Sequence, residues 1–416
     1  MENNNTINNR IPQLRFPGFT GDWEVKSLGE VGVFVRGLSY NKGEVTQNRA
    51  STLVLRSNNI IQDGAVDCRN GLQFVTKRPS SEQILQKGDI VICLSNGSTN
   101  LVGKSANYEG DYAGIATVGA FCGIYRSTAP ITKYLVQTPA YKKSVELIKQ
   151  GGNGALANLY GRDILGLKFY FPNLEEQNEI VECLEAIDQM ISAQNQKVES
   201  LKAHKKGLMQ QLFPQPGATT PALRFPGYSG EWEEKTLGEV ATSFSGGTPK
   251  SGEPRFYGGS IPFIRSGEIH GNKTELFITE DGLKNSSAKL VKKGDLLFAL
   301  YGATSGEVDL SKIEGAINQA ILCIRSEVID TCFLYNYLSH RKDCITSHFL
   351  QGGQGNLSSD IIMSLAIPFP PFAEQQKVAS CLTEMDNIIS AQEQKVESLK
   401  THKKGLMQQL FPQPEK

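Results

Sequence analysis

The sequence lacks several features that would at once assign it to a class of protein. It has no run of about 18 apolar residues, and its first ten residues, MENNNTINNR, lack the apolar core of a signal peptide. Its eight cysteines form no CxxC pair, which argues against a disulfide framework or a zinc site. We therefore expect a cytoplasmic protein with reduced, partly buried thiols, no bound metal and a disordered segment over residues 1–13.

An excess of charge is also missing. The 43 Lys and Arg residues balance the 43 Asp and Glu residues among 416 in total. Only the region before Glu175 is basic, with 19 basic and 13 acidic residues. A polyanionic partner would therefore be bound by local clusters of Lys and Arg, not by a general basic field.

The motifs of common catalytic sites are absent too. The sequence has no GxSxG, HExxH or GxGxxG, no Asn-Pro-Pro-aromatic tetrapeptide of amino-methyltransferases, and its five histidines lack metal-ligand spacing. GSTNLVGKS at Gly97–Ser105 resembles a phosphate loop but has five residues between its glycines, where that loop has four. The simpler interpretation is a loop between two strands. We expect a chain that is not itself an enzyme.

The sequence does contain a long internal repeat. QKVESLKAHKKGLMQQLFPQP at 196–216 returns at 394–414 with one substitution, Ala203 to Thr401. LRFPGFTGDWEVKSLGEV at 14–31 likewise matches LRFPGYSGEWEEKTLGEV at 223–240. A repeat of about 200 residues indicates a duplicated module, in the order lobe, long helix, lobe, long helix.

Each copy of the module ends in a periodic segment, over about 176–213 and 374–411. Its apolar residues are spaced four and three apart, which is typical of a coiled-coil seam, and each helix would be roughly 55 Å long. We expect the two helices to pack antiparallel with the lobes at opposite ends; the alternative is that each is only the core helix of its own lobe. The predicted seam consists of Ile180, Leu184, Ile187, Ile191, Val198, Leu201 and Leu208 in the first helix and Val378, Leu382, Met385, Ile389, Val396, Leu399 and Leu406 in the second.

The lobes have the pattern of mixed α/β domains. Short β-branched and apolar runs, such as Thr52–Leu55 and Leu296–Leu300, lie between loops of Gly, Asn and Ser, and a helix near Tyr134–Lys149 or Phe333–Phe349 follows them. The predicted fold is α+β: two mixed α/β lobes joined by two long antiparallel coiled-coil helices, with a pseudo-two-fold internal repeat. The expected boundaries are 14–174 for the first lobe, 175–216 for the first helix, 217–222 for the linker, 223–373 for the second lobe and 374–416 for the second helix.

The two copies differ most in the middles of the lobes. Identical helix ends suit two copies of one partner and divergent lobes suit two different targets, although simple drift after duplication would leave the same pattern. The polar loops of the lobes carry Arg, which often contacts guanine, and Lys, which holds phosphates; solvated surface charges are the plain alternative. The candidate DNA-binding residues are Arg36, Lys42, Arg49 and Arg56 in the first lobe and Lys250, Arg255 and Arg265 in the second.

The second lobe resembles a known family. GGTP at Gly246–Pro249 with YGGSIPFIRSGEI, then KGDLLF, QGGQGNLS and IPFPPFAEQ before a long helix, is similar to the target-recognition module of specificity subunits of type I restriction-modification systems. The first lobe has a degraded version, with LRSNNI, KGDIVI, QGGNGALANL and YFPNLEEQ but without GGTP.

This resemblance implies a non-catalytic subunit whose two target-recognition domains each read half of a bipartite double-stranded DNA sequence. It implies that the helices hold the spacing and dock two methyltransferase (modification) subunits, and that two restriction (motor-nuclease) subunits join them. The adenine-N6 methyltransferase and ATP-dependent endodeoxyribonuclease activities, with S-adenosylmethionine, ATP and Mg, would belong to those partners, and no cofactor to this chain. The alternative function is a two-lobed coiled-coil scaffold that binds glycan or protein.

Overall fold

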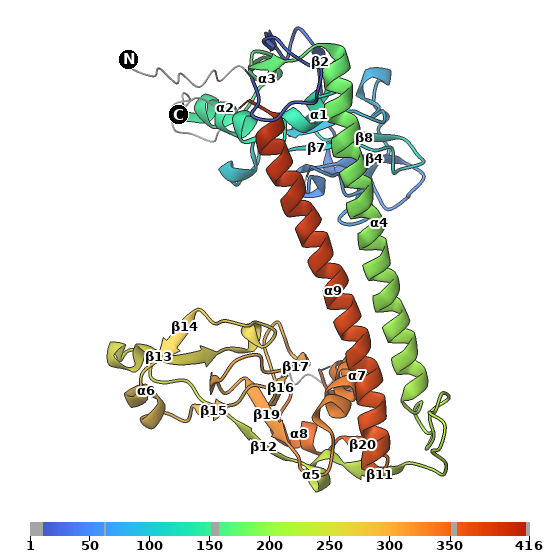
Figure 1. Cartoon of the computed structure of the whole chain (residues 1–416), viewed down its shortest axis with the longest axis vertical. Helices are drawn as coiled ribbons and strands as arrows, with labels where there is room; N and C mark the ends of the chain where they lie inside the picture. Colours follow the sequence, from blue (N-terminus) through green and yellow to red (C-terminus); the bar gives the residue numbers. More distant parts are fainter. Residues whose placement is uncertain (1–10, 62–63, 151–157, 351–355, 413–416) are drawn as a thin grey trace. The chain divides into compact units, whose positions relative to one another are not determined.

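The computed structural model describes residues 11–61, 64–150, 158–350 and 356–412. The chain forms two compact units, one made of Met1–Ala193 with Val396–Lys416 and the other of Gln194–Lys395. Each unit therefore contains one lobe and part of both long helices (Figure 1). Residues 1–10 of the expected disordered segment lie outside the described residues.

The first lobe contains two four-stranded sheets and a two-stranded one. The order β2-β9-β6-β7 is antiparallel throughout, whereas β3-β5-β4-β8 includes one parallel pair, β4 with β8, and β1 pairs with β10. The strands are β1 Glu24–Ser27, β2 Gly32–Arg36, β3 Val45–Thr46, β4 Thr52–Leu55, β5 Gln73–Val75, β6 Ile90–Cys93, β7 Ser105–Asn107, β8 Ala116–Val118, β9 Cys122–Ser127 and β10 Lys168–Phe171.

Apolar strands form the centre of this lobe. All four residues of β4 and of β6 are buried, as expected for short β-branched and apolar runs covered on both faces. The helices α1 Thr132–Leu135, α2 Pro139–Gln150 and α3 Gly161–Leu165 complete the lobe. The single helix predicted near Tyr134–Lys149 is wrong in this detail, because the chain breaks between α1 and α2 and Pro139 begins the second helix, a position that proline favours.

The second lobe repeats this topology with one change. Its sheets have the orders β12-β19-β16-β17, β14-β13-β18-β15 and β11-β20, and β13 pairs in parallel with β18 as β4 does with β8. The added edge strand differs, since β3 lies beside β5 in the first lobe and β15 lies beside β18 in the second. The elements are β11 Glu233–Thr236, α5 Leu237–Val240, β12 Thr242–Ser245, β13 Tyr257–Ile264, β14 Leu276–Ile278, α6 Glu280–Lys284, β15 Lys289–Val291, β16 Leu296–Ala299, β17 Val308–Leu310, β18 Gly315–Ile317, β19 Ile321–Arg325, α7 Thr331–Leu350, α8 Ser359–Met363 and β20 Ala366–Phe369.

The two long helices are α4, Leu174–Leu212, and α9, Phe372–Leu410, with 39 residues each. Each begins two residues before the segment that the seam pattern predicts, and the predicted α+β fold with two long helices is confirmed. The C-terminal end of each helix packs into the lobe of the other copy of the module. Leu410 and Phe411 belong to the core of the first lobe, and Met209, Leu212 and Phe213 belong to the core of the second.

Within each unit the two helices run antiparallel and are joined by an ion pair. In the first unit Lys403 Nζ lies 2.6 Å from Asp188 Oδ1, and in the second Lys205 Nζ lies 2.6 Å from Asp386 Oδ2. Both lysines also lie near an aromatic ring, of Tyr134 at 5.0 Å and of Tyr335 at 5.9 Å. The polar residues that interrupt the apolar pattern thus fix the helix register.

The predicted seam residues are all shielded from solvent to some degree. Eight of the fourteen are buried, namely Ile180, Leu184, Ile187, Val198, Val378, Leu382, Ile389 and Val396, and the other six are half-buried. The first two seam residues of each helix belong to the core of a lobe; they are Ile180 and Leu184 in α4 and Val378 and Leu382 in α9. Each helix is therefore a core helix of its lobe and also a partner of the other helix, so it is not only a core helix.

The lysines of the lysine–aspartate pairs are more buried than the lysine of a third inter-helix pair. This difference predicts how much each pair contributes to the free energy of unfolding. The Lys403 side chain is 13% exposed, whereas Lys202, 2.8 Å from Glu393, is 48% exposed. Lys403→Ala should lower the free energy of unfolding of the first unit by about 1 kcal/mol, because it removes a largely buried charge-assisted hydrogen bond, although Tyr134 Oη still donates to Asp188 Oδ2 at 2.9 Å. Lys202→Ala should cost under about 0.5 kcal/mol. Chemical denaturation of both variants tests this, and equal costs would contradict it.

Candidate nucleic-acid interface

A cavity of about 790 Å³ lies in the first lobe, beside the turn between β8 and β9. Its walls come from the loops that follow β2, β4 and β6. None of the described residues that line it is acidic, and its cations and side-chain amides are Lys42, Arg56, Asn41, Asn58, Gln73 and Asn96. Such a lining suits an anionic ligand that also presents hydrogen-bonding edges.

Two of the predicted DNA-binding residues, Lys42 and Arg56, line this cavity. Lys42 begins a 3-10 turn that Asn41 caps, with Oδ1 accepting from Gly43 N at 2.9 Å, so the backbone is fixed while the ammonium is exposed. Arg56 Nη2 donates to Gly71 O at 3.0 Å. Its Nε is buried and has no hydrogen-bond acceptor among the described residues, so this guanidinium is not fully paired within the protein.

The other two predicted residues of this lobe are separated. Arg36 lines a second cavity of about 370 Å³, which shares Ser95, Ala120 and Phe121 with the first. Arg49 is exposed and lines neither cavity; its carbonyl oxygen accepts from Tyr112 Oη at 2.9 Å. The fold thus brings three of the four candidates to adjoining cavities.

In the second lobe Arg265 is held by two carboxylates. Its Nε and Nη2 lie 3.0 Å from Oε2 and Oε1 of Glu268, and Nη2 also lies 2.8 Å from Glu275 Oε2. Hydrogen bonds from Glu268 and then Glu275 raise the pKa of Arg265. Burial alone would raise the pKa of Glu268, but hydrogen bonds from Arg265 and from the backbone of Glu275 and Arg265 lower it from 4.5 to about 2. In this conformation Arg265 orders the segment between β13 and β14.

Lys250 and Arg255 lie in the loop between β12 and β13. Lys250 is exposed, and Tyr257 Oη donates to Pro249 O at 2.5 Å, which folds the loop back on itself. The Arg255 side chain is exposed, with its guanidinium 4.9 Å from the Phe256 ring centroid and Nε 3.5 Å from Glu253. Arg255 Nε also lies 3.9 Å from Asp281 Oδ2, so the carboxylate contacts of Arg255 are longer than those of Arg265.

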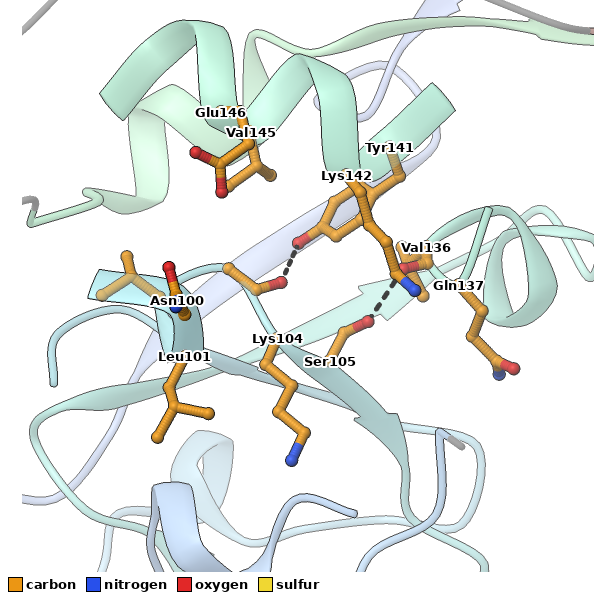
Figure 2. A pocket seen from close by; sticks show the side chains of 12 residues that line it. Asn100, Leu101, Lys104, Ser105, Val136, Gln137, Tyr141, Lys142, Val145 and Glu146 are labelled. Carbon is orange, nitrogen blue, oxygen red and sulfur yellow. Dashed lines mark hydrogen bonds between the residues drawn. The ribbon is translucent and has the colours of Figure 1, made fainter. Parts of the chain in front are cut away.

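The segment that resembles a phosphate loop packs against α2 beside a cavity of about 400 Å³ (Figure 2). Tyr141 Oη donates to Gly103 O and Ser105 Oγ donates to Val136 O, both at 3.0 Å, and Lys104 points away from α2 (Figure 2). The segment leads into β7, which pairs with β6, whereas a phosphate loop begins a helix. It is a strand-to-strand loop, as its spacing predicts.

Comparison with known proteins agrees with this architecture. The model of the type I restriction modification DNA specificity domain matches the chain twice, at residues 20–203 and 229–401. The chain belongs to this family. It is 26% identical to a putative type I restriction enzyme MjaX specificity subunit of Methanocaldococcus jannaschii, over 94% of this chain and 93% of that one. It is 22% identical to the EcoKI specificity subunit of Escherichia coli K12, over 86% of this chain and 80% of that one.

The fold is shared with a solved specificity subunit. A crystal structure of the type I restriction-modification S subunit from M. genitalium superposes with a TM-score of 0.57 at 15% identity, covering 97% of this chain and all of that one. The family match and the curated relatives confirm the prediction of a DNA sequence-specificity subunit, and the glycan or protein scaffold is set aside. Specificity subunits are not enzymes themselves but work with DNA and with the other subunits of a methyltransferase and nuclease complex.

Three further observations concern the residues that the structure describes. None of their helices has the length and apolar character needed to span a bilayer. No group of three or more potential metal ligands occurs among them, and all eight cysteines are free thiols.

The sequence analysis missed the side-chain amides and the aromatic rim of the first cavity. Asn58, Gln73 and Asn96 are far apart in the sequence and come together only through the pairing of β4, β5 and β8 and the position of β6. Asn and Gln contact adenine with paired hydrogen bonds, so their residue type is a signal in the sequence, whereas the predicted DNA-binding residues are all cations. Nothing in the sequence alone indicates that Phe121 is exposed.

The depressed pKa of Glu268 predicts a pH dependence for the second unit. A carboxylate whose pKa falls on folding stabilises the protein above its unfolded value, near 4.5, and this contribution is lost as the pH falls through about 2. Glu268→Gln should lower the free energy of unfolding at pH 7 by about 1–3 kcal/mol. In this variant the free energy of unfolding should also fall less steeply as the pH decreases from 4.5 to about 2 than it does in the wild type.

The matched control is Glu253→Gln, because Glu253 pairs at 3.5 Å with an exposed arginine. It should change stability by under about 0.5 kcal/mol. Urea denaturation across this pH range checks both variants, and an unchanged pH profile in Glu268→Gln would refute the prediction.

Proposed function

We propose that each lobe reads one half of a bipartite double-stranded DNA target, with the first target-recognition domain at 14–174 and the second at 223–373. Each lobe has its own hydrophobic cores, so each has a framework that supports its loops independently. The long helices hold the spacing between the half-sites.

The observation that carries this proposal is that equivalent positions on the same framework bear different polar groups. Arg56 and Arg265 both follow a central strand, and each begins a 3-10 turn whose third residue accepts from the arginine backbone N. That third residue is Asn59 in the first lobe and Glu268 in the second. The arginine is therefore neutralised in the second lobe and partly unpaired in the first, so the two sites favour different DNA contacts.

The repeated part of the helices supports docking of two copies of one partner. Residues 196–200 and 394–398 have the same sequence, QKVES, and in both helices the valine is buried while the other four side chains are exposed. Two identical polar surfaces suit two methyltransferase subunits, which would bind S-adenosylmethionine, and two restriction subunits using ATP and Mg would complete the complex.

Exchange of one lobe tests the reading of half-sites. Replacing residues 32–174 with those of a relative should change one half of the methylated sequence and leave the other half intact. The reason is that the repeated segments at 14–31 and 176–216, which connect the first lobe to the helices, are kept. Replacing 241–373 is the matched control and should change only the other half. Sequencing of genomic N6-methyladenine in cells with each chimera measures both. A change in both halves, or in neither, would overturn the proposal.

A further inference from the structure

Phe121 is the most exposed large apolar side chain among the described residues, at 70% exposure. It lies in the turn between β8 and β9, on the rim that the two first-lobe cavities share. Arg36 lines the cavity on one side of this rim, and Lys42 and Arg56 line the one on the other. Isolated exposed apolar residues are common on protein surfaces, so it is the position between two cationic cavities that gives Phe121 significance.

The turn that carries Phe121 is firmly held by the backbone. The Phe121 carbonyl accepts from Leu94 N at 2.8 Å and from Ser95 N at 3.1 Å, and Cys122 N donates to Gly119 O at 2.8 Å. Gly119 N in turn donates to Leu55 O, at 2.9 Å, on β4. The ring therefore projects from a backbone that has little freedom to fold it away from solvent.

The second lobe has the same turn without the ring. Leu300 N donates to Ala320 O at 2.8 Å, Ile321 N to Asn318 O at 3.2 Å and Asn318 N to Ile264 O at 3.3 Å, which repeats the first-lobe pattern. Ala320 occupies the position of Phe121 and is only 4% exposed. The framework thus forms this turn with alanine, so the phenyl ring of Phe121 is not required for folding.

We propose that Phe121 is a specificity-determining residue of the first lobe, whose ring contacts the C5-methyl group of a thymine in the major groove. A phenyl ring has no hydrogen-bonding group, and the thymine methyl is the apolar feature that distinguishes base pairs in that groove. Arg36 and Lys42 on the two sides of the rim hold phosphates and so position the ring. This inference rests on the proposed reading of one half-site by the first lobe.

Uracil, which lacks the methyl group, provides the test. The assembled complex of the full chain with its methyltransferase subunit is titrated with its target duplex, in which single thymines of each half-site are replaced by uracil. For the wild type, one replacement in the first half-site should weaken binding about fourfold, the equivalent of one methyl group removed from contact. Phe121→Ala should bind about fourfold more weakly than the wild type and be indifferent to that same replacement.

The control is Leu147→Ala, because Leu147 is an exposed apolar residue of α2 that lines neither cavity. It should behave as the wild type does. The inference is overturned if Phe121→Ala still discriminates thymine from uracil, if it weakens all sequences alike, or if the first half-site contains no thymine. If the wild-type complex instead fails to prefer its target over a scrambled duplex, the proposed function itself fails.

Discussion

Each lobe is completed by the C-terminal end of the helix that belongs to the other copy of the module, and the rest of the structure depends on this exchange. In the first unit Leu14 N donates to Gln409 O at 3.0 Å, while Arg15 of the same segment forms a two-point ion pair with the buried Glu176 at the start of α4. In the second unit Leu223, Gln211, Arg224 and Glu374 repeat the arrangement. One short LRFPG segment therefore joins the beginning of one long helix to the end of the other.

This exchange explains why some parts of the two sequence copies are nearly identical and others are not. LRFPG and the helix ends form joints in which a buried carboxylate must keep its arginine, since an unpaired buried charge is costly. The loops that line the cavities of the first lobe have no such constraint, because most of their side chains lie outside the core. The chain thus combines nearly identical contacts at the helix ends with divergent loops, which agrees with the proposed reading of two different half-sites.

The sequence predicted the long helices well because their apolar spacing persists over many turns and proline limits both ends. It could not show that Ile180 and Leu184 pack in a lobe core, because the same spacing serves a core helix and a coiled coil. Among the candidate DNA-binding residues, sequence reasoning found the cations of the first cavity but not its amides, which only strand pairing brings together. It named Arg265 as a candidate DNA-binding residue but could not show its pairing with Glu268 and Glu275, at sequence distances of three and ten residues.

The most direct test of the exchange is hydrogen–deuterium exchange on a chain that ends at Lys395. The removed residues, Val396–Lys416, belong entirely to the first unit although they are last in the sequence. If each lobe is completed by the helix end of the other copy, β6 and β9 of the first lobe should lose protection while β16 and β19 of the second keep it. Loss of protection in the second lobe, or no loss in the first, would contradict this account.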